Sequence, residues 1–524
     1  MRSDEGSGTG RADRAEAMER RALTSDAARP EAVERRHAAG GRTARENIDD
    51  LVDPGSYVEY GGLAIAAQRA RRETRELLER TPADGLVAGV GRVNGELFGE
   101  RSACAVLSYD YTVLAGTQGA IGHRKKDRLF ELIERMRLPT VFFAEGGGGR
   151  PGDTDFAVVS ALDTRAFALW ARLSGVVPRI AVVAGRCFAG NALIAGASDL
   201  IVATESVSLG MGGPAMIEGG GLGRVDPDDV GPIEMQAPNG VVDARVADEA
   251  EAVAVTRRLV SYFQGRTAPG EEPDQLRLRD LVPERRRRAY DVRPGIEALA
   301  DRNSVTFLRE EFGRGMVTAL ARIEGRPLGI VANNPTHLGG AITSDGADKA
   351  ARFMQLCDAF ELPIVSLIDT PGMMVGPDAE ATALVRHCSR LFVIGGAVRV
   401  PLVAVILRKA YGLGAQAMAG GSLHEPLLTV GWPTAELGPM GLEGAVRLGF
   451  RRELEAIADE AEREERVREL TAEAHERAKA LNAATLFELD DVIDPAETRR
   501  LIASTLAAAS SSEPPPARRF LDAW

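Results

Sequence analysis

Two stretches of the chain decide the fold: VPRIAVVAGRCFAGN at Val177–Asn191 and VPLVAVILRKAYGLGA at Val400–Ala415. Each begins with Val-Pro, continues as an apolar run that predicts a buried strand, and ends in a turn of small residues. Strands that alternate with helices are typical of α/β proteins with a mainly parallel sheet. The two stretches therefore predict an α/β unit that occurs twice.

Each half of the chain carries two more landmarks before its Val-Pro stretch: a glycine-flanked strand start, and a Leu-Pro apolar run that ends near glycine. These landmarks lie at 85–95 and 138–143 in the first half, and at 315–325 and 362–367 in the second. Helical patterns separate them, at His123–Met136 and Ala347–Phe360. Three landmarks in one order at nearly constant spacing indicate internal duplication.

The length of 524 residues predicts two large domains. A polar segment of low hydrophobicity from Gly265 to Arg288 is interpreted as the linker, and a charged helix is expected from Arg452 to Leu481. The predicted divisions are a disordered tail at 1–28, a first subdomain at 29–285, a second subdomain at 286–510 and a tail at 511–524.

Composition excludes several classes of function. The formal net charge is −12 and aromatic residues make up 5% of the chain, which argues against nucleic acid and anionic membrane as partners. The four cysteines form no C-x-x-C pair, so buried reduced thiols are expected rather than a zinc site. A polar N-terminus without a signal-peptide core and the lack of a membrane-length apolar run predict a cytoplasmic protein.

A glycine-rich turn, Glu145–Arg150, follows the first Leu-Pro strand. Four successive glycines can present backbone N–H groups to an anion or a carbonyl oxygen. The turn matches neither a Walker A loop nor a dinucleotide fingerprint, so a ligand role and a merely tight turn both remain open. A basic patch around Arg124, Lys125 and Lys126 is a candidate for holding the phosphates of a ligand.

The small-residue turns at Gly185–Ala192 and Arg408–Ala415 each stand at the start of a helix. Two adjacent N–H groups in such a turn can point at one oxygen and form an oxyanion hole. Close packing of helix on strand requires small residues as well and is the alternative interpretation. A third turn, Asp369–Gly372, lacks an accompanying P-loop, and His387 is a weak candidate base because a lone histidine is more often structural.

No G-x-S-x-G elbow, H-E-x-x-H pair or metal-ligand cluster occurs in the sequence, so no metal is expected. Two candidate oxyanion holes without a nucleophile indicate enolate chemistry in which a cofactor supplies the base.

At these residues the chain resembles the carboxyltransferase β subunits of biotin-dependent acyl-CoA carboxylases. The resemblance runs from about Glu31 to Arg500 and rests on ordered matches: Thr43–Ile48, Asp53–Ser56, Asp110–Gly116, Tyr290–Arg293, Val331–Pro335, Ile368–Gly372, Arg408–Gly412 and Trp432–Glu436. It implies two crotonase-like (ClpP/crotonase) subdomains and transfer of a carboxyl group from carboxybiotin to the α-carbon of an acyl-CoA through an enolate. It also implies a homohexamer that works with a biotin carboxylase/biotin carrier α subunit, because the chain has no Ala-Met-Lys-Met site of its own.

The resemblance assigns roles to individual residues. Ala189 and Gly190 would donate N–H groups to the thioester oxygen, and Leu413 and Gly414 to the biotin ureido oxygen, with the register defined to within one residue. Substrate- or cofactor-binding residues would be Gly147, Gly148, Gly149, Arg150, Tyr411, Gly412 and Gln416.

The chain departs from the usual family pattern in both turns, where Ala189-Gly190 and Gly412-Leu413 replace Gly-Gly, and at Gly146–Arg150, where relatives often have Ser-Gly-Gly-Ala-Arg. Gln416 replaces the Asp or Ile of relatives that select short acyl groups, so the acyl preference does not carry over. The alternatives are a biotin-dependent decarboxylase or transcarboxylase subunit and a non-catalytic assembly subunit; a stand-alone hydratase lacks its acidic pair.

Overall fold

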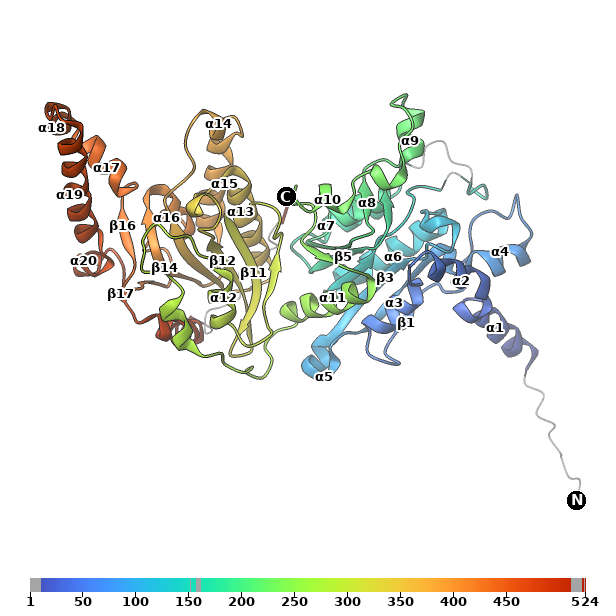
Figure 1. Ribbon diagram of the computed structural model, residues 1–524. Helices are drawn as coiled ribbons and strands as arrows, with labels where there is room; N and C mark the ends of the chain where they lie inside the picture. The colour runs from blue at the N-terminus through green and yellow to red at the C-terminus, as the bar shows by residue number, and fades with distance from the viewer. Residues whose placement is uncertain (1–10, 151, 157–161, 510–520, 523) are drawn as a thin grey trace, which may run out of the picture. The chain divides into compact units, whose positions relative to one another are not determined.

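The structure, a computed structural model, describes residues 11–150, 152–156, 162–509, 521, 522 and 524 (Figure 1). It divides into two compact units. The first comprises the chain up to Gln236 together with Arg245–Val260, and the second comprises Ala237–Ala244 together with Ser261–Asp522. The linker expected at Gly265–Arg288 therefore lies within the second unit, where it contains a short 3-10 helix.

The first unit contains a mixed sheet of seven strands and a separate sheet of two strands. Its strands are β1 (Val58–Glu59), β2 (Leu86–Arg92), β3 (Ala103–Tyr109), β4 (Thr140–Phe143), β5 (Arg179–Val183), β6 (Arg186–Phe188), β7 (Leu200–Thr204), β8 (Ser208–Gly210) and β9 (Ala244–Val246). Its helices are α1 (Ala12–Ala22), α2 (Pro30–Ala38), α3 (Ala44–Leu51), α4 (Thr74–Arg80), α5 (Gly95–Phe98), α6 (Ala120–Met136), α7 (Ala166–Arg172), α8 (Gly190–Gly196), α9 (Pro214–Gly219), α10 (Ile233–Gln236) and α11 (Glu249–Phe263).

The second unit repeats this plan. Its strands are β10 (Thr306–Leu308), β11 (Met316–Ile323), β12 (Arg326–Asn333), β13 (Ile364–Thr370), β14 (Leu402–Tyr411), β15 (Leu428–Gly431), β16 (Glu436–Gly438) and β17 (Asp491–Val492). Its helices are α12 (Arg293–Leu299), α13 (Ser344–Ala359), α14 (Pro377–Glu380), α15 (Leu384–Ala397), α16 (Gly412–Met418), α17 (Leu442–Gly449), α18 (Arg451–Ala456), α19 (Glu460–Ala478), α20 (Ala480–Thr485) and α21 (Thr498–Ala508).

The two sheets share one strand order. The first runs β1-β2-β3-β4-β5-β7-β9 and the second β10-β11-β12-β13-β14-β15-β17. In both, the first three strands pair antiparallel. The pairs from β3 to β7 in the first sheet and from β12 to β17 in the second are parallel. The α/β class is confirmed, and the sheets are mixed rather than mainly parallel along their whole width.

Hairpins account for the antiparallel pairs. In the second unit only Glu324 and Gly325 separate β11 from β12, and both have positive φ, of 50° and 73°. Two positive-φ residues form the turn whose twist matches an antiparallel pair. In the first unit the corresponding connection is longer and holds α5. From the following strand onward, α6 and α13 form the crossovers that make the neighbouring strands parallel.

Each unit has its own core. In the first, Trp170, Phe142, Phe130 and Tyr109 pack ring on ring beneath the sheet. In the second, aliphatic side chains of β11 to β15 pack with Trp432, which is 1% exposed. These separate cores hold the turns that follow β4, β5, β13 and β14 on rigid strands.

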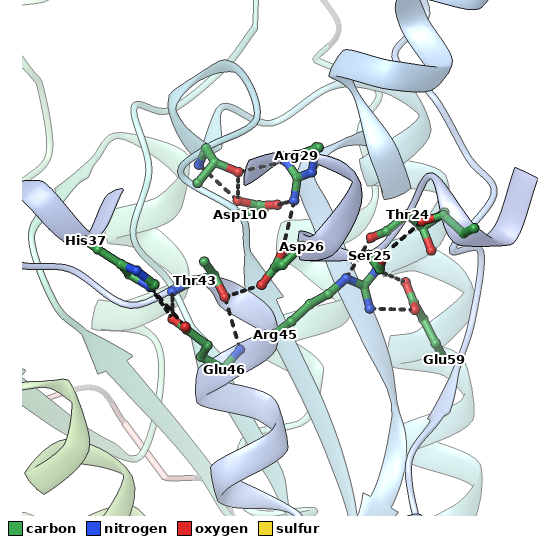
Figure 2. A network of polar contacts seen from close by, with 12 residues as sticks. Thr24, Ser25, Asp26, Arg29, His37, Thr43, Arg45, Glu46, Glu59 and Asp110 are labelled. Carbon is green, nitrogen blue, oxygen red and sulfur yellow. Dashed lines mark hydrogen bonds and ion pairs between the residues drawn. The ribbon is translucent and has the colours of Figure 1, made fainter. Parts of the chain in front are cut away.

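The N-terminal segment is more ordered than its composition suggests. The expectation of a disordered tail over 1–28 is wrong for Ala12–Ala28, which forms α1 and a 3-10 turn; residues 1–10 lie outside the described part. Buried Arg29 pairs with Asp110 at 2.9 Å, and Thr43 donates to Asp26 at 2.5 Å (Figure 2). The ion pair with Asp110 anchors the end of the N-terminal segment to the first unit.

The charged region after β16 is broken rather than continuous. The helix expected over Arg452–Leu481 is three helices, α18 to α20, and α19 begins where Asp459 caps it by accepting from the N–H of Glu462. The tail expected at 511–524 lies outside the described residues except for 521, 522 and 524.

Candidate functional site

The first small-residue turn joins β6 to α8. Ala189 lies there with φ 51° and ψ −119°, a conformation that favours glycine, and its own N–H donates to the carbonyl of Gly210 at 3.2 Å. The next N–H, of Gly190, belongs to the first turn of α8, where helix geometry provides no acceptor. No other acceptor for it is present in the described part of the chain. Of the two expected donors, Gly190 is open and Ala189 is already bonded.

The glycine loop after β4 packs against this turn. The N–H of Gly147 donates to Ala115 O at 3.1 Å, and that of Gly148 donates to Asn191 Oδ1 at 3.1 Å. A Cβ on Gly148 would lie 2.9 Å from the Cβ of Ala189. The N–H of Gly149 has no acceptor among the residues that the structure describes. Gly149 and Gly190 thus carry the open donors where loop and turn meet.

Arg150, expected to bind substrate, is instead committed to the protein. Its side chain is 4% exposed and pairs with Asp84 at 2.5 Å. It also donates to the hydroxyl and the carbonyl of Thr117. Its guanidinium therefore braces the glycine loop from behind.

The expected phosphate patch is not available at the surface. Lys125 and Lys126 are 9% and 0% exposed, and Lys125 donates to the carbonyls of Ala83 and Leu86. Only Arg124 of the three is exposed, where its guanidinium stacks on Phe156. Two adjacent lysines on a helix predict a basic surface, but here both side chains lie on the buried side of α6.

The second turn, from β14 into α16, repeats the first geometry at a shifted register. Tyr411 pairs with Gly438 as Phe188 pairs with Gly210, and Gly412 has φ 55° where Ala189 has 51°. The geometric counterpart of Ala189-Gly190 is therefore Gly412-Leu413, one residue before the expected Leu413-Gly414.

Leu413 and Gly414 have different surroundings in this turn. Leu413 is 62% exposed, and no acceptor for its N–H is found within the described residues. Gly414 is buried against the loop after β13, where a Cβ would lie 2.7 Å from the Cα of Gly372 and 3.1 Å from the backbone nitrogen of Met373. Gly414 thus permits close approach of helix and loop.

A cavity of about 610 Å³ opens beside the second turn. Gly412, Leu413 and Gln416 line it, together with the apolar residues Leu423, Leu437, Pro439, Ala478, Ala483 and Leu486. Tyr411 does not line it, because its hydroxyl donates to buried Glu436 at 2.9 Å. Burial and Glu436 raise the pKa of Tyr411, so the phenol stays protonated.

The Asp-Thr-Pro-Gly turn is structural. Asp369 is 0% exposed and accepts from Arg408 at 3.0 Å, with the ammonium of Lys409 at 3.5 Å. His387 pairs with Asp348 at 2.6 Å on the inner side of α15. A histidine held by a carboxylate in this way fits a structural role.

Sequence reasoning missed a polar chain beneath the first turn, in which Lys126 contacts Gln118 and Gln118 contacts Asn191. Asn191 lies 73 residues after Gln118, so only the amide of Asn191 next to the turn was visible as a signal. Within the described ranges no cluster of three metal-ligating side chains occurs. No described helix is both long and apolar enough to cross a membrane.

Comparison with known proteins identifies the class of this site. A family model described as "Carboxyl transferase domain" matches residues 35–520. The chain belongs to the carboxyl transferase family. This carboxyl transferase is 33% identical to the methylmalonyl-CoA carboxyltransferase 12S subunit of Propionibacterium freudenreichii subsp. shermanii, over 90% of each chain. It is 32% identical to the biotin-dependent long chain acyl-coenzyme A carboxylase beta4 subunit of Mycobacterium tuberculosis, over 94% and 93%.

Solved structures agree. A single-chain, multi-domain long-chain acyl-CoA carboxylase superposes with a TM-score of 0.91 at 56% identity, over 95% of this carboxyl transferase. Our chain spans 49% of that protein's length. The transcarboxylase 12S crystal structure superposes with a TM-score of 0.83 at 30% identity, over 98% of both chains. The family resemblance is confirmed, as is the implied class of enzyme, a carboxyltransferase of biotin-dependent acyl-CoA carboxylases and transcarboxylases.

Proposed function

We propose that this carboxyl transferase moves a carboxyl group from carboxybiotin, carried on a partner protein, to the α-carbon of an acyl-CoA through an enolate. One observation carries the proposal: two turns of the same geometry each present an unpaired N–H beside a loop that follows the neighbouring strand. Acyl enolate formation and carboxyl transfer each develop negative charge on an oxygen, so two separate sets of donors are needed.

In the first unit, the donors that remain open are Gly190 and Gly149, and we assign them to the thioester oxygen. The N–H groups of Ala189, Gly147 and Gly148 are already bonded within the protein, so we assign these residues to holding the loop and the turn in place. Preorganised donors of this kind are each worth roughly 100- to 1000-fold in rate.

In the second unit we assign the backbone N–H of Leu413 to the ureido oxygen of biotin. We assign the N–H of Met373, on the adjoining loop, as the second donor to the same oxygen. Gly414 has the role of bringing helix and loop together. When bound, biotin supplies the carboxyl group and a base for the α-proton, so neither turn needs a nucleophile from the protein. The cavity lined by Leu413 and Gln416 combines apolar walls with the polar residues Arg477, Asn482 and Glu488, which fits a polar ring system of that kind.

The shared strand order of the two sheets supports an internal duplication of a crotonase-like unit. The likeness to the 12S hexamer supports a homohexamer. The likeness to a biotin-dependent carboxylase beta4 subunit supports a partner that carries biotin. That relative acts on long-chain acyl-CoA, and we propose long acyl chains as the first substrates to test.

A transcarboxylase subunit is the second candidate, favoured by the likeness to the methylmalonyl-CoA carboxyltransferase. The two are separated by co-purifying the chain with its biotinylated partner and measuring ATP-dependent fixation of bicarbonate on acetyl-, propionyl- and long-chain acyl-CoA. A carboxylase fixes bicarbonate, whereas a transcarboxylase requires a carboxylated acyl-CoA donor. If the complex neither fixes bicarbonate nor transfers carboxyl groups between acyl-CoAs, the proposal fails.

Gly190→Pro tests the first turn, because proline lacks the N–H. We expect turnover about 100- to 1000-fold below that of Gly190→Ala, with CoA-ester affinity retained. Gly190→Ala is the matched control: its Cβ meets the same neighbours, Gln118 and Phe167 at 2.9 Å, yet the N–H remains. Equal turnover in the two variants would remove Gly190 from the site.

A further inference from the structure

A buried lysine stands behind the first turn without a carboxylate partner. Lys126 on α6 is 0% exposed, and its ammonium donates to Gln118 Oε1 at 2.5 Å and to the Tyr109 hydroxyl at 3.0 Å. Among the described residues, no Asp or Glu lies within ion-pair distance of it. Burying a cation on neutral acceptors alone is costly, and burial lowers the pKa of Lys126 to about 7.

The contacts of Lys126 continue to the site. Gln118 donates from Nε2 to Asn191 Oδ1 at 3.1 Å, and the same oxygen accepts the N–H of Gly148 at 3.1 Å. Asn191 is the second residue of α8, and Gln118 touches the neighbouring Gly190, since a Cβ there would lie 2.9 Å from Gln118 Nε2. One chain of hydrogen bonds therefore runs from the ammonium through Gln118 and Asn191 to Gly148 of the glycine loop, and Asn191 adjoins Gly190 in the first turn.

The second unit builds the matching turn without this chain. Gln118 bridges to Gly149 as Ile342 bridges to Met373, which aligns Gln118 with Ile342 and, eight residues on, Lys126 with Ala350. The position of Asn191 corresponds to Gly414, because Ala189 and Gly412 have similar positive φ angles and follow the equivalent strand pairs Phe188–Gly210 and Tyr411–Gly438. In the second unit Ala350, Ile342 and Gly414 stand at the positions of Lys126, Gln118 and Asn191, and the turn still forms. The fold of the turn therefore does not require the lysine.

We propose that Lys126 is a positioning residue for the acyl-CoA oxygen: through Gln118 and Asn191 it fixes the N–H donors of the first turn and places positive charge behind them. The inference rests on the proposed function, because it assigns the thioester oxygen to that turn. With a pKa of about 7, Lys126 is protonated in about half of the molecules at neutral pH. In that form its charge, held in a water-poor interior, acts on charge that develops in the transition state more than on the neutral bound ester. The expected effect is therefore on turnover rather than on binding.

Lys126→Met is the test, and Lys125→Met is its control. Lys125 precedes Lys126 on α6 and is also buried, but it donates only to the carbonyls of Ala83 and Leu86. In the complex with its biotinylated partner, we expect Lys126→Met to lower kcat about tenfold or more with KM changed less than about threefold. Lys125→Met should lower the melting temperature with kcat preserved. An unchanged kcat in folded Lys126→Met would overturn the proposal.

The route through Gln118 is tested by a double-mutant cycle with Gln118→Leu. If Lys126 acts through Gln118, the double variant loses about as much kcat as the more impaired single variant. Independent, additive losses would contradict the route.

A spectroscopic measurement separates this inference from the proposed function. The carbonyl stretch of a ¹³C=O-labelled acyl-CoA bound to the carboxyl transferase should shift to lower frequency than that of the free ester, and Lys126→Met should reduce the shift. A shift that is equal in wild type and variant would refute the role of Lys126 and leave the site standing. No shift in the wild type would refute the assignment of the turn and, with it, the inference.

Discussion

Replacing Ala189 by glycine should stabilise the first unit. Ala189 has φ 51° and ψ −119°, a region in which a side chain costs about 1–3 kcal/mol. Glycine removes that strain but loses about 0.5–1 kcal/mol more conformational entropy on folding. Ala189 is only half-buried, so little packing is lost. The expected gain in unfolding free energy is about 0.5–2 kcal/mol.

The reverse change at the matching position has the opposite sign. Gly412 has φ 55°, and a Cβ there would lie 2.8 Å from the backbone carbonyl oxygen of Pro439. Gly412→Ala therefore adds the strain that Ala189 carries as well as a contact that the backbone must relieve, at a cost of about 2–4 kcal/mol. The pair of variants compares one backbone conformation with and without a side chain.

Differential scanning calorimetry of the two full-length variants measures both effects. For units of this size, 1 kcal/mol shifts the melting temperature by about 2–4 °C. Ala189→Gly should therefore melt higher than wild type by a few degrees and Gly412→Ala lower. A lower melting temperature for Ala189→Gly, or an unchanged one for Gly412→Ala, would show that the two turns do not share the conformation described here.

Two further predictions concern buried carboxylates. Asp369→Ala leaves the guanidinium of Arg408 without its carboxylate in a site with 0% exposure, and should lower the unfolding free energy in urea by about 3–5 kcal/mol, more than Asp369→Asn does; a loss below 1 kcal/mol would contradict it. Burial raises the pKa of Glu145 to about 7 despite its pairing with Arg36. The native state then holds this proton more tightly than the unfolded chain, so the unfolding free energy contributed by Glu145 falls as pH rises from about 4.5 to about 7. Glu145→Gln should flatten that decline in melts across this range, and an unaltered pH profile would refute the assignment.

The repeating strand-and-turn plan could be predicted because it rests on short-range patterns. Apolar runs bounded by Pro and Gly mark strands locally, and α6 and α13 begin only three residues before the predicted helices. The antiparallel pairs at the start of each sheet were not predicted. Between β11 and β12 the chain reverses because Glu324 and Gly325 both adopt positive φ, and Glu-Gly is not a dipeptide that predicts such a turn. The N-terminal anchoring was missed for a related reason: the ion pair of Arg29 with Asp110 joins segments far apart in the chain.

Side-chain direction accounts for most of the remaining misses at the site. Arg150 and Lys126 are residue types that often bind anionic ligands, yet both side chains are buried in the first unit. The direction of such a side chain depends on tertiary packing. An arginine after a glycine loop is as suitable for bracing the loop as for binding a phosphate. The partner that decides between these roles, Asp84, stands far away in sequence.

The register of the two turns shows why matching glycine with glycine misleads. Matching the last glycine of each turn aligns Gly190 with Gly414. The structure instead aligns Gly190 with exposed Leu413. Gly412 is glycine because φ is positive, and Gly414 is glycine because the backbone of Gly372 lies 2.7 Å from where its Cβ would be. The first turn has other residues at these two positions. Ala189, with a strained positive φ, takes the place of Gly412, and Asn191, which belongs to the polar chain, takes the place of Gly414. An N–H donor needs no particular side chain, so the two proposed donors, Gly190 and Leu413, share no residue type that the sequence could reveal.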